Sequence, residues 1–215
     1  MTTLYSFFNS STSYRVRVAL ELANIKYEYH GVNIRIGEQS SATHIQLNPS
    51  KGVPILIDEN IGSLTQSMAI LAYINDHHAN GSLLPSDSLS KARVLEFCNI
   101  IAADIHPVNN LRILKYLQKE FKLTEQDKKS WYNHWISEGF DAIETWLEKY
   151  GTSDFFCYGT TASLADCCLI PQVANALRMG CDLSKYSHAM AIYNHCIEQA
   201  AFKRAAPEKQ PDYMA

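Results

Sequence analysis

The hydrophobic pattern of this chain changes once, between residues 81 and 89. Up to that point short apolar runs of strand type alternate with helical spacing, and beyond it only long helical stripes remain. A single change of this kind favours an α/β domain over residues 1–81, a linker at 82–88 and an all-helical domain over 89–215. The chain has 215 residues, of which 47% are hydrophobic, so it can fill either one large core or two small ones.

The apolar runs of the first domain are expected to form the strands of a mixed sheet. One helix is expected from Val16 onward and another between Met68 and Ile74. The order is therefore βαβ, an irregular or short helical stretch, and then ββα, which implies both parallel and antiparallel neighbours. The expected strands are Leu4–Phe8, Tyr27–Val32, Val53–Ile57 and Ser63–Thr65.

Four hydroxyl residues occupy positions 10 to 13, at the first strand-to-helix junction of a domain that has no cysteine. Ser11 or Thr12 is expected to cap the helix, and capping alone would explain a hydroxyl there. A helix N-terminus also offers unpaired amides and a partial positive charge, which favour an anion in front of it. We therefore infer a site for a thiolate that the chain does not itself supply.

Two more segments of this domain have the chemistry to bind a peptide-like ligand that carries negative charge. They would bind it together with Ser10–Arg15, which is suited to its thiolate. Val53 and Pro54 begin a strand, where the backbone exposes a donor and an acceptor and where a cis proline is favoured. Gln66 and Ser67 open a helix, whose N-terminus suits a carboxylate. Together the three segments predict one extended ligand site.

The patterns of the helical domain indicate structural roles. An aromatic stripe is interpreted as core packing rather than a cofactor site, and Gly139 on the same face allows another helix to approach closely. Ser163 and Asp166 have the spacing of a capping box, which we prefer to a catalytic acid at Asp166, and Pro171 should kink the helix that follows. The stripe comprises Trp131, Trp135, Ala142, Trp146 and Tyr150.

Charge and cysteine usage exclude several classes of function. A formal net charge of -3 and a pI near 6.2 argue against nucleic acid or an anionic membrane as a partner. No leader-like segment and no run of about 18 apolar residues is visible, so a cytoplasmic location is expected. The six cysteines form no CxxC pair and are expected to be reduced core thiols. Cys167 and Cys168 are adjacent, but no clustered histidine accompanies them, so no metal site is expected.

Together these motifs resemble the zeta class of cytosolic glutathione transferases, which includes maleylacetoacetate isomerase and maleylpyruvate isomerase. The resemblance covers nearly the whole chain. It is carried by Ser10–Leu20, Asn48–Pro54, Gln66–Ile70, Asp104–Arg112, Ser163–Asp166, Pro171–Ala176 and Gln210–Asp212.

The resemblance implies a thioredoxin-like N-terminal domain, an all-helical C-terminal domain, a homodimer and glutathione as the cofactor. It assigns glutathione contacts to Ser10, Ser11, Thr12, Gln39, Val53, Gln66, Ser67, His106, Asn110 and Arg112. It assigns catalysis to Ser10, Ser11, Thr12 and Arg15, and substrate binding to Asn9 and Arg178. The implied reaction is cis–trans isomerisation of a dicarboxylic ketoacid by reversible addition of the glutathione thiolate to its double bond.

Two positions depart from the family pattern. Asn9 stands where the family commonly has an arginine, so a charged contact to a substrate carboxylate is replaced by a neutral one. Thr12 stands where maleylacetoacetate isomerases often have a cysteine, but it retains a hydroxyl and occurs in members similar to maleylpyruvate isomerase. These two residues are expected to bear on substrate choice.

Several functions therefore stay open from the sequence. Isomerisation of maleylacetoacetate is favoured, with maleylpyruvate or a similar ketoacid as the close alternative. A glutathione transferase or peroxidase acting on electrophiles comes next, followed by a non-catalytic module that binds glutathione. A thioredoxin-type redox enzyme fits least, because Ser10 and Ser13 stand where a cysteine pair would be needed.

Overall fold

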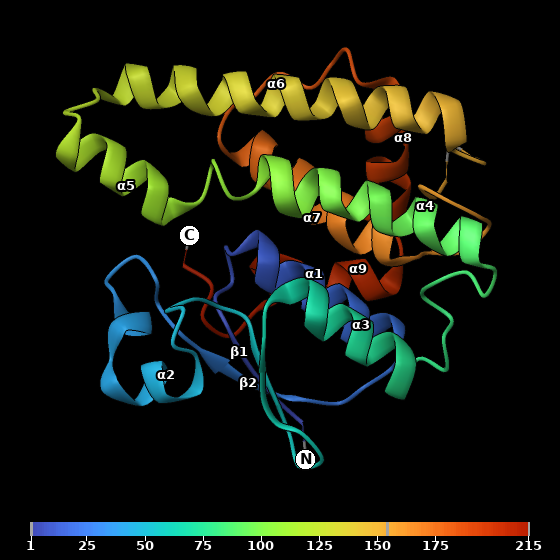
Figure 1. Ribbon diagram of the computed structural model, residues 1–215, viewed down its shortest axis with the longest axis horizontal. Helices are drawn as coiled ribbons and strands as arrows, with labels where there is room; N and C mark the ends of the chain where they lie inside the picture. The colour runs from blue at the N-terminus through green and yellow to red at the C-terminus, as the bar shows by residue number, and fades with distance from the viewer. Residues whose placement is uncertain (1, 154, 215) are drawn as a thin grey trace. The chain divides into compact units, whose positions relative to one another are not determined.

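The computed structural model describes residues 2–153 and 155–214, which group into two units (Figure 1). The first unit contains the residues up to Pro85 together with those from Ile197 onward, and the second contains Ser86–Cys196. The expected domain over 89–215 is therefore divided, because its last segment packs with the first unit. The cause is a set of hydrogen bonds between the two ends of the chain. Arg17 Nε donates to the carbonyl oxygen of Ala205 over 2.8 Å, and the Asp212 carboxylate accepts from the backbone amide of Phe8.

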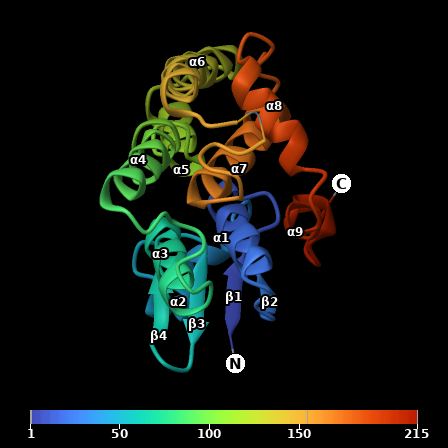
Figure 2. The same ribbon diagram turned by 90° about the vertical axis from the view of Figure 1, so that its right-hand side faces the viewer.

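A four-stranded mixed sheet forms the centre of the first unit, in the order β2-β1-β3-β4. β1 pairs in parallel with β2 and antiparallel with β3, which pairs antiparallel with β4. Helix α1 lies between α3 and α9 (Figure 2). The elements are β1 (Thr3–Ser6), α1 (Ser11–Leu22), β2 (Glu28–Gly31), η1 (Glu38–Ser40), α2 (Ala42–Leu47), β3 (Ile55–Asp58), β4 (Gly62–Thr65), α3 (Ser67–His77), α9 (Ala200–Ala205) and η3 (Pro207–Lys209).

The order of these elements confirms the predicted α/β domain, and register explains how its core forms. Leu4 on β1 lies opposite Leu56 on β3, and neither side chain is exposed. β3 begins two residues later than expected, because Pro54 has no amide hydrogen to donate to a neighbouring strand. The peptide bond between Val53 and Pro54 is cis, as predicted.

Among the described residues of the second unit, all regular secondary structure is helical. α6 is its longest helix, with α5 beside its N-terminal part and α4 beside its C-terminal part (Figure 1). The predicted capping box is confirmed: Ser163 and Asp166 exchange side-chain and backbone hydrogen bonds, and α7 continues through Pro171. The elements are α4 (Ser88–Asn99), a π-helical segment η2 (Ile100–Ile105), α5 (Leu111–Glu120), α6 (Glu125–Tyr150), α7 (Leu164–Arg178) and α8 (Ser187–Cys196).

Gly139 allows η2 to approach α6 closely, as its position in the sequence predicts. A Cβ atom on Gly139 would lie 2.2 Å from Cγ1 of Ile105. The aromatic stripe is only partly core, since Ala142 is exposed and the buried face is carried by residues such as Phe140 and Ile143. The buried face of α6 therefore lies beside the expected stripe and shares only Trp146 with it.

All six cysteines lie in the second unit, each is buried, and none of them forms a disulfide bond. Burial raises the pKa of Cys157, Cys167 and Cys181, so these thiols stay protonated at neutral pH. Within the described residues, no helix combines the length and apolarity needed to cross a bilayer.

Candidate active site

Ser10 caps helix α1, which corrects the expectation that Ser11 or Thr12 does so. Ser10 has an extended backbone, and its Oγ accepts a hydrogen bond from the amide of Ser13 over 3.3 Å. The helix therefore begins at Ser11. The shift of one residue places Ser11 and Thr12 in the first turn, where backbone amides face away from the helix.

The hydroxyls of Ser10 and Thr12 form a directed chain to the next segment of the site. Thr12 Oγ1 donates to the carbonyl oxygen of Val53 over 3.0 Å. Since a hydroxyl has only one proton, Ser10 Oγ must be the donor in its 2.9 Å contact with Thr12 Oγ1. Both protons are thus committed to protein oxygens in this arrangement.

A polar loop fixes the backbone before the cis peptide bond. The carbonyl oxygen of Gly52 accepts from Asn48 Nδ2 and from His44 Nε2, each over 2.9 Å. Asn48 Oδ1 in turn accepts from the amide and the hydroxyl of Ser50. These contacts hold Val53 in place, where its carbonyl oxygen meets Thr12.

The N-terminus of α3 is suited to an anion. Ser67 is its first residue, and the preceding Gln66 has a left-handed backbone with φ of 68° and no side-chain capping hydrogen bond. The first turn carries no acidic residue. The helix dipole at this end is therefore not offset by a carboxylate of its own helix.

Arg15 and Arg17 are both buried in α1 but differ in their partners. Arg17 donates to the carbonyl oxygens of Phe7, Phe8 and Ala205, and burial lowers its pKa. Arg15 donates from Nη1 to Ser67 Oγ over 3.3 Å, whereas its Nε and Nη2 have no hydrogen-bond partner among the described residues. Arg17 is thus a structural tie, and Arg15 points toward α3.

Two other predicted residues of the first unit also present polar groups. Gln39, in η1, has a buried Oε1 that no donor reaches within the described parts of the chain. Asn9 is half-buried and directly precedes the cap residue Ser10. Hydrogen bonds thus join Ser10, Thr12 and Val53. Gln39 and Asn9 belong to the same unit but take no part in these hydrogen bonds.

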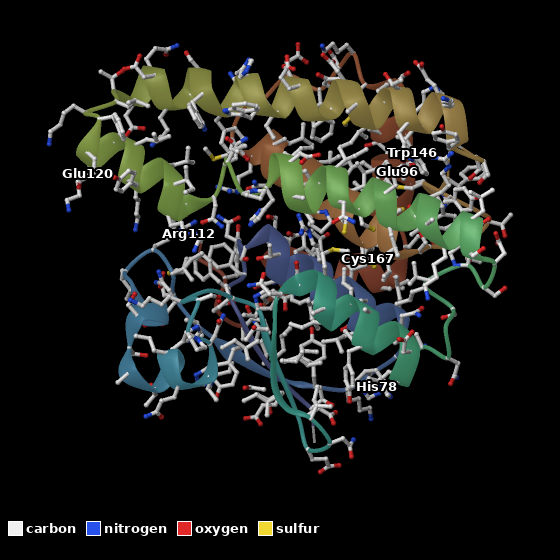
Figure 3. All side chains as sticks on the ribbon, in the orientation of Figure 1. His78, Glu96, Arg112, Glu120, Trp146 and Cys167 are labelled. Atoms are coloured by element: carbon white, nitrogen blue, oxygen red, sulfur yellow. The ribbon has the colours of Figure 1, made fainter. Side chains whose placement is uncertain are left out.

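In the second unit, His106, Asn110 and Arg112 lie around the start of α5. Asn110 caps this helix, and its Oδ1 accepts from the amide of Arg112 over 3.1 Å. The Asn110 Nδ2 group can only donate a hydrogen bond, so Nε2 of His106, 3.2 Å away, must accept it. A neutral His106 therefore carries its proton on Nδ1. Arg112 is exposed in the first turn (Figure 3).

Arg178 is held at the end of α7 by a relay that sequence reasoning missed. Its Nη2 donates to Asn175 Oδ1, and Asn175 Nδ2 donates to the hydroxyl of Tyr132 over 2.7 Å. Burial is the main cause that raises the pKa of Tyr132. The three-residue spacing of Asn175 and Arg178 on one helix was the available signal, but Tyr132 on α6 could not be paired with them from the sequence.

Comparison with known proteins identifies the family. Residues 1–76 match the model of the glutathione S-transferase N-terminal domain. A probable maleylacetoacetate isomerase of Vibrio cholerae serotype O1 is 41% identical, with 97% of each chain covered. A holo structure of maleyl pyruvate isomerase, described as a bacterial glutathione S-transferase of the zeta class, has a TM-score of 0.95 and 40% identity, and the match covers 99% of this chain and all of that one. The chain belongs to the zeta class of glutathione transferases.

Residues 1–76 of this zeta-class chain form the thioredoxin-like N-terminal domain and lie in the first unit. A maleylacetoacetate isomerase of Methylobacterium extorquens AM1 with bound malonate and glutathione also shares the fold. Its TM-score is 0.94 at 30% identity, and the match covers 99% of this chain and all of that one. The predicted family and fold class are thus confirmed, whereas the roles of individual site residues stay predictions.

Proposed function

We propose that this zeta-class chain is a glutathione-dependent isomerase that converts maleylacetoacetate to fumarylacetoacetate. The observation that carries the proposal is the set of hydroxyls at the start of α1, which lies against the backbone of Val53. The similarity to isomerases that span the same length supports it. Location in the cytoplasm and assembly as a homodimer belong to the same proposal.

The residues of the first unit fit glutathione, a tripeptide with one thiol, two carboxylates and a peptide backbone. The N-terminus of α1 suits a thiolate, and Val53 suits peptide groups through its backbone. The N-terminus of α3 suits a carboxylate, because neither an acidic side chain nor a side-chain cap occupies its first turn. Gln39 adds a buried acceptor that lacks a donor among the described residues.

We assign the stabilisation of the thiolate to Ser11 because it is the first residue of α1, directly after the cap residue at the helix N-terminus. The protons of Ser10 and Thr12 are directed to other protein oxygens, so these two residues orient the turn and hold it against Val53. The N-terminus of α1 contributes roughly 0.3–2 kcal/mol to an anion, and a hydroxyl donor about 1.5–3 kcal/mol. Together they bring an ordinary thiol pKa of about 8.5 down to roughly 5–7.

Bound glutathione supplies a thiolate that adds to the double bond and leaves again, which allows rotation about the intervening single bond. The chain's own task is to hold the dicarboxylic substrate during that exchange. Arg178 is the candidate for one carboxylate, since Asn175 and Tyr132 fix its guanidinium. Asn9 offers a neutral hydrogen bond in place of the arginine common in the family, which lowers the affinity for a second carboxylate.

The proposal is tested by ultraviolet difference absorbance of bound glutathione as a function of pH. The wild-type protein should show a thiol pKa below that of free glutathione. Ser11→Ala should raise it toward the free value, whereas Thr12→Val should leave it within a few tenths of wild type. A bound thiol that titrates like free glutathione would show that the site does not ionise it and would favour a non-catalytic binding module.

Maleylpyruvate is the second candidate substrate, favoured by Thr12 and by the similarity to the maleyl pyruvate isomerase structure. Direct assays on both ketoacids, beside conjugation of chlorodinitrobenzene, separate the alternatives. Turnover of maleylacetoacetate should exceed turnover of maleylpyruvate. Inactivity on both ketoacids, with conjugation retained, would replace the isomerase with a transferase.

A further inference from the structure

The guanidinium group of Arg15 is buried with most of its hydrogen-bonding capacity unused. Arg15 is 1% exposed, and within the described residues its Nε and Nη2 donate to nothing. Its one hydrogen bond reaches Ser67 Oγ, at 3.3 Å from Nη1. An arginine stays charged in proteins, and none of the carboxylates that the structure describes pairs with this buried positive charge.

Arg17 shows what a purely structural arginine does in the same helix. It is also buried, but each of its three nitrogens donates a hydrogen bond to a protein oxygen. A buried charge without such partners is unfavourable, so replacing it with an apolar residue of similar size removes a desolvation cost from the free protein. The difference between the two arginines indicates that an anion absent from the chain itself completes the environment of Arg15.

The contact with Ser67 gives the direction in which that anion lies. Ser67 Oγ accepts the proton of Arg15, which leaves its own hydroxyl proton available for another oxygen. Ser67 is also the first residue of α3, whose N-terminus lacks both a side-chain cap and an acidic residue in its first turn. A buried guanidinium, a polarised hydroxyl and a helix N-terminus therefore converge on one place.

We propose that Arg15 is a positioning residue for a carboxylate of glutathione and acts on it through Ser67. The inference rests on the proposed function and deepens it. It moves Arg15 away from the sulfur, where the resemblance places it, to the opposite part of the ligand. The charge of Arg15 strengthens the hydrogen bond that Ser67 makes to the carboxylate, because charge-assisted donors polarise their neighbours.

A first test compares thermal stability with and without ligand. Arg15→Met should leave the unfolding temperature of the free protein unchanged or raise it, and should abolish most of the increase that glutathione produces. Arg17→Met is the matched control, because it removes a fully bonded arginine and should lower the unfolding temperature of the free protein. A loss of stability in free Arg15→Met as large as that in Arg17→Met would show a structural role and overturn the proposal.

A second test locates the effect along the ligand by calorimetric titration. S-Methylglutathione has no ionisable sulfur, so an effect at a carboxylate should persist with it. Arg15→Met should weaken its binding roughly 10- to 100-fold, the usual size of a lost hydrogen bond to a charged group. Ser67→Ala should weaken it similarly, and the double variant should lose much less than the product of the two factors.

Two analogues identify the carboxylate. One lacks the carboxylate of the γ-glutamyl residue, as 4-aminobutanoyl-cysteinyl-glycine, and the other carries the glycine carboxylate as an amide. The effect of Arg15→Met should fall below about threefold with one analogue and stay at its full size with the other. Equal factors for glutathione and both analogues would overturn the proposal, as would an effect confined to ligands with a free thiol. If the wild-type protein binds neither glutathione nor its S-methyl form, the proposed function fails as well.

Discussion

The hydroxyl of Thr12 donates a 3.0 Å hydrogen bond to the carbonyl oxygen of Val53, 41 residues further along the chain. This contact joins the first turn of α1 to the backbone that precedes Pro54. Thr12→Val preserves the shape of the side chain but removes the donor, and should lower the free energy of unfolding by about 1–2 kcal/mol. Thr12→Ser keeps the hydroxyl and should lose less than half of that, as measured by urea denaturation. Equal losses for the two variants would show that the hydrogen bond to Val53 is not the cause of the loss.

Arg17 should be the more important of two arginine contacts between α1 and α9. Replacement of Arg17 by methionine leaves the carbonyl oxygens of Phe7, Phe8 and Ala205 without this donor, and should cost about 1–3 kcal/mol of unfolding free energy for each oxygen left unsatisfied. Arg204→Met removes an exposed ion pair with Glu21 and should cost less than about 1 kcal/mol. Limited proteolysis should release the segment after residue 197 faster only in the Arg17 variant.

Asp58 should make the stability of the first unit depend on acid pH. A backbone hydrogen bond from Asn60 is the main cause that holds the pKa of Asp58 below its ordinary value of 3.8, with further hydrogen bonds from Thr2 and the Asn60 side chain. The unfolded chain therefore takes up the proton first as pH falls. The stabilisation that ionised Asp58 gives to the folded state is complete above pH 3.8 and disappears as pH falls through the pKa of Asp58 in the folded protein. Asp58→Asn should reduce the difference in unfolding free energy between pH 6 and pH 3, whereas Glu28→Gln, at an exposed position of β2, should retain it.

Gly139→Ala should destabilise the second unit through a single steric contact. The added Cβ atom would lie 2.2 Å from Cγ1 of Ile105, a β-branched side chain that is 1% exposed and has no room to move. Overpacking of this kind costs roughly 1–3 kcal/mol. In chemical denaturation, the double variant with Ile105→Ala should lose less than the sum of the two single losses. An additive result would show that the contact with Ile105 is not the cause.

The cysteines should be unreactive in the folded protein. Burial raises the pKa of Cys181 to about 11 and also raises that of Cys167 well above its ordinary value. At pH 8 an aromatic disulfide reagent should therefore label no thiol rapidly until denaturant is added. Rapid labelling that disappears in Cys181→Ser would instead reveal an accessible thiolate there.

The sequence predicts the elements of this fold well because local rules fix them. The capping box at Ser163 and Asp166 and the cis bond before Pro54 each depend on residues close together in the chain, and both are confirmed. The return of the C-terminal segment to the first unit was not predicted, because it depends on the pairing of Arg17 with Ala205, 188 residues away. Hydrophobic spacing carries no information about such a pairing.

In the candidate site, too, the sequence predicts the features that depend on neighbouring residues and misses those that depend on distant ones. Hydroxyls at a helix start are visible in the sequence, but the choice of Ser10 as the cap depends on backbone geometry at a single residue. The orientation of Arg15 toward Ser67 could not be predicted either, since Arg15 and Arg17 are both buried in α1 and their partners come from other segments of the chain. Long-range polar contacts of buried groups are thus the part that sequence patterns leave open.

Because the first unit includes residues from both ends of the chain, it cannot be completed during synthesis until the last residues leave the ribosome. A fragment that stops at Pro85 would contain the whole sheet, yet Arg17 would lack the carbonyl oxygen of Ala205 and the amide of Phe8 would lack Asp212. The second unit, by contrast, is continuous in sequence. Gene fusions and domain exchanges within this family should therefore transfer residues 86–196 as an insert and keep the two flanking segments from one parent.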